Sequence, residues 1–391
     1  MDIDFESASF LENPHKSYDA LRAAHPIFFS ERNDMWLFSS YEAVKAVLND
    51  DINFVYNKRA GTDHIPTNSS SNRLFKYWFV YQSEEKQKVF RKIVGPYFSG
   101  KIIADIESYI VKEVDSILGD FKERSIDLVE SYGTLLPIKV MMRILGISDV
   151  DVNFIKKVGG LMEHFMHFPS NDKDQKIFDF ATQNLEQFIF NRIEKKDYDQ
   201  DGIISYLLGK AEEGIITREE AIYNVMFFVM AAAQTTLHSL CNALMLLVVN
   251  KDQRKLFIEN SESADKYVEE LMRYESTVSY ARRFAAHDIE VFGQQVKKGD
   301  RMLLLLNAAN RDPLVFSNPH QLDLDRLPVK NLAFGYGGHF CLGAHLAKME
   351  IRVALTYFFE KYPNCDLVDQ QIHWNDRFGF RVIKNFKVKL N

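Results

Sequence analysis

The chain has 391 residues, of which 46% are hydrophobic and 26% charged, and its formal net charge is −6. These values indicate a globular protein with a large core, and the acidic balance argues against nucleic-acid binding, which usually needs a basic surplus. The three cysteines are widely spaced and form no CxxC pair, which excludes a disulfide framework and a zinc ribbon and is typical of a reducing cytosol. Since the acidic N-terminus has no apolar signal segment, we expect a cytoplasmic protein.

The first eighty residues predict two helices, a short strand and a long loop. One helix begins at Asn13-Pro14 and a second covers residues 40–48, with a strand at 35–38 between them. Residues 57–74 are polar and turn-rich, which predicts a loop, and an aromatic cluster at 75–81 follows it. Loops of that length are usually functional lids or disordered segments.

Helices are predicted for nearly all of residues 83–250, with breaks at proline-rich and glycine-rich positions. Within this region, the segment 158–168 is rich in methionine, histidine and phenylalanine. Its composition fits a mobile aromatic segment over a cavity, and it fits a plain helix end equally well.

The stretch 221–250 contains no acidic or basic residue other than one histidine, so a membrane span is the first alternative to consider. Polar side chains interrupt the apolar face, however, and these are Asn224, Gln234, Thr235, Thr236, His238, Ser239 and Asn242. The pattern favours a buried helix at the centre of a large α-rich protein, and we expect no membrane anchor. The polar cluster is either a structural hydrogen-bond network or a ligand site.

Short strands are predicted after residue 287. They cover 289–293 and 301–306, joined by a turn at 297–300, and strand-like patterns return at 380–383 and 386–390.

A single cysteine occupies a glycine-rich, aromatic loop with the sequence Phe334-Gly335-Tyr336-Gly337-Gly338-His339-Phe340-Cys341-Leu342-Gly343. Glycines allow close approach to a flat cofactor, and the helix expected to follow would lower the thiol pKa. At this point two interpretations remain open, a thiolate metal ligand and a buried cysteine in a turn.

Four features in fixed order bear on this choice, namely Gln234-Thr235-Thr236, the Glu270–Arg273 pair, Arg326 and the cysteine loop. In this order they closely resemble the cytochrome P450 family of haem-thiolate monooxygenases, specifically its soluble bacterial members. The loop matches the family pattern F-G-x-G-x-H-x-C-x-G at every fixed position. The resemblance covers essentially the whole chain and implies one domain over residues 1–391, mainly α with small β-sheets, in the cytochrome P450 fold.

The resemblance implies haem b as a non-covalently bound cofactor, with Cys341 as the axial thiolate on iron. Phe334 would pack beside the haem and the sulfur. His339, Arg283 and Arg91 match residues that bind the haem propionates. Each of these residues alone would more often be ordinary loop packing or a surface charge.

Gln87 stands where the family often has a propionate-binding histidine, so the resemblance implies that a donor is kept there and a charge is lost. The set Glu270, Arg273 and Arg326 resembles the ion-pair triad that holds the cysteine loop. As an ordinary surface pair it would contribute only a few tenths of a kcal/mol.

Thr235 fits the threonine that assists oxygen activation in the family, but Gln234 stands where the family usually has an acid. Glutamine forms hydrogen bonds and cannot titrate. Protons would then come through water, another group or the substrate, or the enzyme would be driven by peroxide.

The resemblance places mostly apolar and aromatic residues over the cofactor, namely the 57–81 loop, the 158–172 segment, Ala231, Ala232, Thr277 to Tyr280 and Phe378-Gly379-Phe380. These imply a fairly large hydrophobic substrate, free or tethered to a carrier protein. Polar anchors would be Asn57, Arg59, His64 and Tyr280. Basic residues that either dock a ferredoxin or flavodoxin or form a solvated face are Arg91, Lys92, Lys101, Lys348 and Arg352.

Hydroxylation or epoxidation in secondary metabolism, with O2 and electrons from a separate redox partner, is the activity that the resemblance implies. Because Gln234 replaces the acid, oxidative aromatic coupling and peroxide-driven chemistry are alternatives. A haem-binding module without turnover is an alternative of another class, and a helical protein with a metal-binding cysteine is a remote one.

Overall fold

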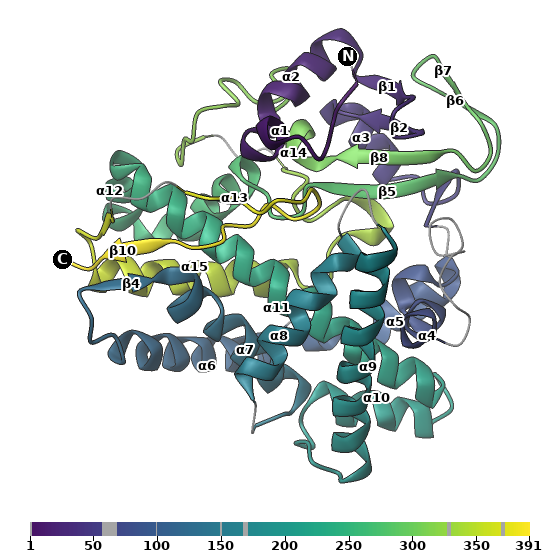
Figure 1. The fold of residues 1–391 in the computed structure, drawn as a ribbon. Coiled ribbons are helices and arrows are strands. Elements are labelled where there is room, and N and C mark those ends of the chain that lie inside the picture. The colour runs from purple at the N-terminus through teal and green to yellow at the C-terminus, as the bar shows by residue number, and fades with distance from the viewer. Residues whose placement is uncertain are drawn as a thin grey trace.

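Helices make up most of the protein, and small β-sheets lie beside them (Figure 1). The computed structural model describes residues 2–56, 69–98, 100–148, 151–166, 171–326, 330–368 and 372–391. The α-helices are α1 (Ala8–Glu12), α2 (Pro14–Ala24), α3 (Tyr41–Leu48), α4 (Ser70–Tyr77), α5 (Glu84–Val94), α6 (Gly100–Gly119), α7 (Leu135–Leu145), α8 (Val152–Met162), α9 (Asp172–Glu194), α10 (Ile203–Glu212), α11 (Arg218–Val249), α12 (Lys251–Glu259), α13 (Ala264–Tyr274), α14 (Leu306–Ala309) and α15 (Ala344–Lys361).

The strands are β1 (Ile27–Ser30), β2 (Met35–Phe38), β3 (Phe54–Val55), β4 (Ser125–Asp127), β5 (Tyr280–Ala285), β6 (Ile289–Val291), β7 (Gln294–Val296), β8 (Arg301–Leu305), β9 (Asp366–Leu367) and β10 (Lys387–Lys389). Shorter helical turns are η1 (Phe79–Tyr81), η2 (Gly95–Phe98), η4 (Glu163–Met166), η5 (Ser261–Ser263) and η6 (Gly337–His339), and η3 (Val129–Gly133) is a π-helix.

The five-stranded sheet joins three N-terminal strands to two strands from the last third of the chain. Its strand order is β1-β2-β8-β5-β3, with β2 parallel to β8 and β5 antiparallel to β8. The N-terminal residues therefore pair with residues 280–305, and Figure 1 shows this sheet beside α2 and α14 at one end of the molecule. The other described sheets are β4-β10-β9 and the hairpin β6-β7.

Helix α11 lies at the centre of the helical part and contacts α4, α7, α8, α9, α10, α13 and α15. It begins with a capping box, in which the Thr217 side chain accepts from the Glu220 backbone and the Glu220 side chain accepts from the Thr217 backbone. Within the described residues it is the one helix long and apolar enough to span a membrane, and 83% of its most apolar window is buried in the protein. The other helices, not lipid, cover this apolar surface, which confirms the predicted buried helix.

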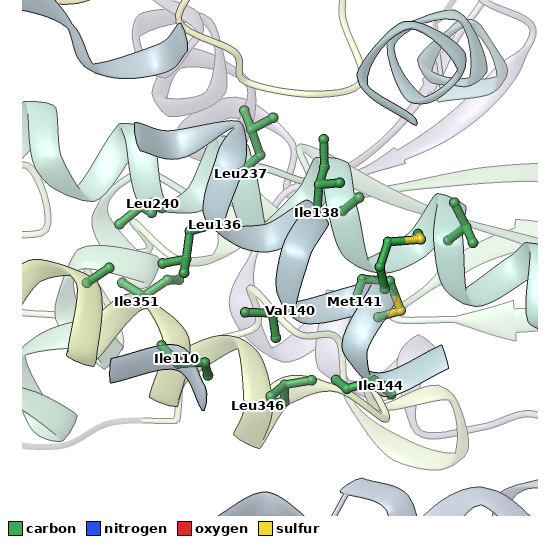
Figure 2. Close-up of a cluster of buried hydrophobic side chains, with 14 of the residues drawn as sticks. Ile110, Leu136, Ile138, Val140, Met141, Ile144, Leu237, Leu240, Leu346 and Ile351 are labelled. Carbon is green, nitrogen blue, oxygen red and sulfur yellow. The ribbon is translucent and has the colours of Figure 1, made fainter. Parts of the chain in front are cut away.

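The largest hydrophobic core forms where α6, α7, α11 and α15 meet (Figure 2). Leu136, Val140 and Ile144 recur at helical spacing along one face of α7 and point toward α15 and α6. Burying each such side chain contributes about 1.5–3 kcal/mol. This packing fixes α11, which carries Gln234 and Thr235, and α15, which begins directly after the cysteine loop.

Several local predictions were wrong. Helix α4 starts at Ser70, inside the predicted 57–74 loop, because the Ser69 side chain accepts from the Asn72 backbone and caps the helix. Residues 57–68 lie outside the described residues. Strands β1 and β4 were not predicted, and the predicted strand at 380–383 is reduced to isolated bridges at Phe380 and Ile383.

Candidate active site

A cavity of about 390 Å³ lies between α11, η4, β5 and the cysteine loop. Cys341, Phe334, His339, Arg283 and Arg91 line it, together with Thr235 and Gln234 of α11. Gln87 instead lines a smaller neighbouring cavity of about 300 Å³. The fold thus brings together, around one mostly apolar cavity, all of the predicted site residues except Gln87.

The cysteine loop is held by its own backbone. The Cys341 N–H donates to the Phe334 carbonyl at 2.9 Å, which closes the loop. Gly337 has a φ of +70°, and a Cβ there would lie 2.5 Å from the Leu48 carbonyl oxygen, so only glycine fits against the end of α3. Helix α15 begins directly after the loop, at Ala344.

Burial raises the pKa of the Cys341 thiol, and the Gly343 amide and Arg91 act in the opposite direction. The amide at the start of α15 thus lowers the thiol pKa as expected, but burial outweighs this effect and the net direction is upward. The accessible surface of the residue faces the cavity that it lines. Among the described residues, no group of three or more His, Cys, Asp and Glu side chains could hold a metal ion.

Arg283 is a buried cation with incomplete hydrogen bonding. Arg283 is 1% exposed, and its Nη1 atom donates to the Arg282 carbonyl at 2.9 Å. Its Nε and Nη2 atoms have no hydrogen-bond partner, and the Tyr56 ring lies 4.4 Å from its guanidinium carbon. A buried guanidinium with two free donors is costly unless an anion binds there.

Gln87 supports His339 from the side away from the cavity. Its side-chain nitrogen lies 2.9 Å from His339 Nδ1. Burial, then Arg283 and Arg91, lower the pKa of His339 to about 3, so this imidazole is neutral at physiological pH. A hydrogen bond to a ring nitrogen fixes the orientation of the imidazole.

Asp51 also lies beside Arg283 and His339, although no pattern in the sequence pointed to it. Its carboxylate is 3.8 Å from Arg283 Nη2 and 3.7 Å from His339 Nε2. Burial raises the pKa of Asp51, and Arg283 opposes that effect. Arg91 is held separately, since its Nη2 donates to the Phe340 carbonyl at 2.9 Å.

Gln234 and Thr235 have different partners. The Thr235 hydroxyl donates to the Ala231 carbonyl at 2.6 Å, one turn earlier in α11. The Gln234 amide, oriented by its hydrogen-bond network, accepts from the Gly160 N–H at 3.2 Å and donates to Glu163 Oε1 at 2.7 Å. His238 Nε2 lies 2.7 Å from the same oxygen. Glu163 was absent from the sequence-based candidates although its neighbours in the 158–168 segment were named.

The polar cluster on α11 also includes structural contacts. Asn224 accepts from the Phe79 N–H, and Ser239 and Asn242 donate to the Thr277 hydroxyl. Asn224 and Asn242 lie outside the cavity lining, whereas Thr236 and Ser239 belong to it.

The predicted ion-pair triad is present. Glu270 binds Arg273 at 2.6 Å and Arg326 at 3.1 Å. Arg273 also donates to the carbonyls of Asn310 and Pro319, so the triad holds the segment before the cysteine loop and not the loop itself. The connection to the loop passes through Asn310, whose side chain accepts from the Leu332 N–H at 2.7 Å.

The other predicted pocket residues divide between the cavity and the core. Ala231, Ala232, Thr277, Tyr280 and Phe380 line the cavity. Phe378 was wrongly placed there, because its ring stacks on Phe5 in the N-terminal core. Asn57, Arg59, His64 and the 167–170 part of the 158–172 segment lie outside the described residues.

Two of the predicted partner-docking cations are neutralised within the protein. Lys348 pairs with Glu269, and Arg352 pairs with Glu107 and Asp265. The side chain of Lys101 is outside the described part of the chain. Fewer unpaired cations are therefore available to dock a redox partner than the sequence indicated.

A family model described as Cytochrome P450 matches residues 138–376. The biotin biosynthesis cytochrome P450 of Bacillus subtilis (strain 168) is 27% identical over 388 residues, which cover 98% of this chain and 97% of that protein. The vitamin D(3) 25-hydroxylase of Pseudonocardia autotrophica is 29% identical over 378 residues, which cover 93% of this chain and 90% of that protein.

Solved structures show the same fold. P450BioI in complex with hexadec-9Z-enoic acid ligated acyl carrier protein has a TM-score of 0.89 and 26% identity, covering 98% of this chain and 99% of that one. CYP109E1 from Bacillus megaterium in complex with testosterone also has a TM-score of 0.89 and 26% identity, covering 98% and 100%.

Proposed function

Because the chain belongs to the cytochrome P450 family of monooxygenases, we propose that its cavity oxidises a fairly large hydrophobic small molecule by hydroxylation or epoxidation. One observation carries this proposal. The Cys341 thiol and the Thr235 hydroxyl line the same largely apolar cavity.

Proteins of this family bind haem b through a cysteine thiolate, and the bound haem supplies the chemistry that activates O2. The residues of this cavity fit that cofactor. The Nε and Nη2 donors of buried Arg283 have no hydrogen-bond acceptor, since Asp51 stays 3.8 Å away, and a haem propionate would supply one. Cys341 would be the metal ligand, with Arg91 and His339 also at the propionate edge.

The other residues of the set would orient these groups and exclude water. Gln87 would hold the His339 ring through the 2.9 Å hydrogen bond. The Phe334 ring, which lines the cavity next to the cysteine loop, would limit access of water to the sulfur. Because the Thr235 hydroxyl donates to Ala231, its lone pairs are free to accept from water or a ligand in the cavity.

The substrate proposal rests on the lining and on the relatives. An apolar cavity with few polar groups binds hydrophobic molecules in a defined orientation. The names of the relatives include biosynthetic enzymes and a complex with a fatty acid on an acyl carrier protein. We therefore assign the protein to secondary metabolism, with a substrate that is either free or tethered to a carrier protein, and with a ferredoxin or flavodoxin as electron donor.

The absorption spectrum of the reduced protein with carbon monoxide tests the cofactor assignment. Thiolate ligation gives a strongly red-shifted Soret band, and haem-loaded, folded protein without that band would contradict the assignment. Product formation is then measured with a ferredoxin system and two probes, hexadec-9-enoic acid and testosterone. Oxygenated product supports the proposed activity. A protein that binds O2 stably and forms no product with either probe would instead support a haem-binding module without turnover.

The glutamine at position 234 favours a second candidate activity, either oxidative aromatic coupling or a peroxide-driven reaction. Neither of these needs an acid next to Thr235. Replacing the ferredoxin system by hydrogen peroxide distinguishes the two. Product at comparable rates with peroxide would favour the second candidate.

A further inference from the structure

The Glu163 carboxylate reaches the cavity from outside α11, and no sequence motif indicated it. Glu163 follows the last residue of α8 and lines the cavity beside α11. Its side chain is 18% exposed, and its Oε1 atom accepts from two side chains of α11. The donors are His238 Nε2 at 2.7 Å and the Gln234 amide nitrogen at 2.7 Å.

The two donors converge because of helical spacing. Gln234 and His238 are four residues apart, so they lie on the same face of α11. Gln234 is anchored at its other end by the Gly160 N–H. His238 Nδ1 is buried and has no hydrogen-bond partner, and the Phe380 ring lies 6.4 Å from the imidazole.

We propose that Glu163 supplies the proton-transfer carboxylate that α11 lacks, with His238 as its proton partner and Gln234 as the residue that positions it. This inference rests on the proposed monooxygenase function. Each turnover consumes a substrate C–H bond, O2, two electrons and two protons, and yields a C–OH bond and one water. The electrons come from the redox partner, and the protons pass from solvent through Glu163 to water in the cavity beside Thr235.

The geometry separates this role from an ordinary ion pair between two helices. A simple pair needs only one donor and one acceptor, and α8 already has such a pair in Lys156–Glu130, far more exposed. The Glu163 carboxylate instead lies at the cavity, next to the position where the family places its acid. A glutamine at 234 is then expected, because a second acid there would place two carboxylates within hydrogen-bond distance.

The first test is Glu163→Gln in the haem-loaded protein reduced by ferredoxin. Glutamine keeps an oxygen that accepts from His238, and it cannot titrate. O2 consumption should fall roughly tenfold or more, and its solvent isotope effect in D2O should rise, since general acid–base catalysis contributes roughly 10²–10⁴-fold. Glu130→Gln, which neutralises the exposed partner of Lys156 in α8, should behave as the wild type.

A swap variant tests the position of the acid. Glu163→Gln combined with Gln234→Glu exchanges the two side chains and keeps one carboxylate and one amide in contact. It should recover most of the lost rate. Unchanged O2 consumption and an unchanged isotope effect in Glu163→Gln would overturn the proposal, as would a swap variant no better than that single variant.

A measurement without turnover keeps the test independent of activity. The ¹⁵N resonances of His238 are compared between wild type and Glu163→Gln in the diamagnetic reduced carbon monoxide form. In the described part of the chain, Glu163 is the one charged group within ion-pair distance of this ring. Because the variant replaces a charged acceptor by a neutral one, the Nε2 resonance should shift, and identical spectra would overturn the proposed pair. If the wild type lacks the red-shifted carbon monoxide band, the proposed function itself fails, which the spectrum shows separately.

Discussion

Glu270 and Arg273 form two hydrogen bonds inside α13, at 2.6 and 2.8 Å, and neither residue is more than 6% exposed. Arg326 adds a third contact to the same carboxylate at 3.1 Å. Two guanidinium groups thus converge on one buried acid, and removal of that acid leaves both without their counter-charge.

We predict that Glu270→Ala destabilises the protein by about 3–5 kcal/mol, the usual cost of breaking a buried pair from one side. Expression and haem content should fall together, because the segment before the cysteine loop loses its anchor. The matched control is Glu259→Ala, which removes an exposed partner of Lys255 and should cost about 0–1 kcal/mol. Soluble Glu270→Ala protein with full haem content would contradict the prediction.

Cys341→Ser should abolish the red-shifted Soret band of the reduced carbon monoxide form, because a hydroxyl does not replace a thiolate as a soft ligand. Cys241→Ala is the control, since Cys241 is 1% exposed and packs against Gly133 away from the cavity lining. The control should keep the band. A retained band in the Cys341 variant would exclude this residue as the ligand.

A buried histidine near the N-terminus predicts acid sensitivity. Burial, then Arg311, lower the pKa of His15 to about 4, although Glu275, 3.7 Å from its Nε2, acts in the opposite direction. Burial raises the pKa of Glu275, but His15, Arg381 and Arg311 outweigh burial and bring it down to about 2.

The sign of the pH effect follows from which state binds protons. Below pH 6.5 the unfolded chain protonates His15 while the folded protein does not, so stability falls as the pH falls toward 4. The His15 contribution is about 3 kcal/mol. Glu275 adds a further loss as the pH falls from 4.5 toward 2.

Urea unfolding at pH 7, 5 and 4 checks this prediction. His15→Gln should flatten the decline between pH 6.5 and 4 relative to the wild type, with the exposed His287→Gln as the matched control. Equal slopes for His15→Gln and wild type would count against the buried neutral histidine.

Two adjacent glycines of α8 give a matched pair of substitutions. A Cβ on Gly159 would lie 2.1 Å from the end of the Gln234 side chain, whereas a Cβ on Gly160 meets nothing within 4 Å. Gly160→Ala should stabilise the protein by up to about 1 kcal/mol through helix propensity. Gly159→Ala gains the same propensity but must displace Gln234.

Denaturant unfolding of both variants, with O2 consumption as a second measurement, checks the effect of this displacement. Gly159→Ala should be less stable than Gly160→Ala and should lower O2 consumption, while Gly160→Ala should not. Equal behaviour of the two variants would show that the position of the Gln234 side chain does not matter.

The family, the mainly α fold with small sheets and the haem b cofactor were all predicted from the sequence, and the comparisons confirm them. They were predictable because the cysteine loop is a local pattern of ten residues that matches the family at every fixed position. Two of its glycines, Gly335 and Gly337, adopt a positive φ. The long apolar helix α11 was also predictable, because its apolar residues and polar interruptions lie within one continuous segment of the chain.

Other features could not be predicted because they depend on contacts between distant segments. Strand β4 pairs with β10 more than 250 residues later, and its three residues carry no pattern of their own. Phe378 was predicted to line the pocket, but its ring stacks on Phe5 near the N-terminus. Asp51 follows α3 in sequence, yet its carboxylate lies beside Arg283 and His339.

By itself the sequence indicated the cofactor and Cys341 as the candidate ligand, because its cysteine loop and three distant features resemble the cytochrome P450 family in fixed order. It also determined that α11 carries glutamine where an acid is expected. Only the tertiary structure decided that an acid is nevertheless present there. Glu163 and His238 are 75 residues apart, and α8 must pack on α11 before the two side chains meet.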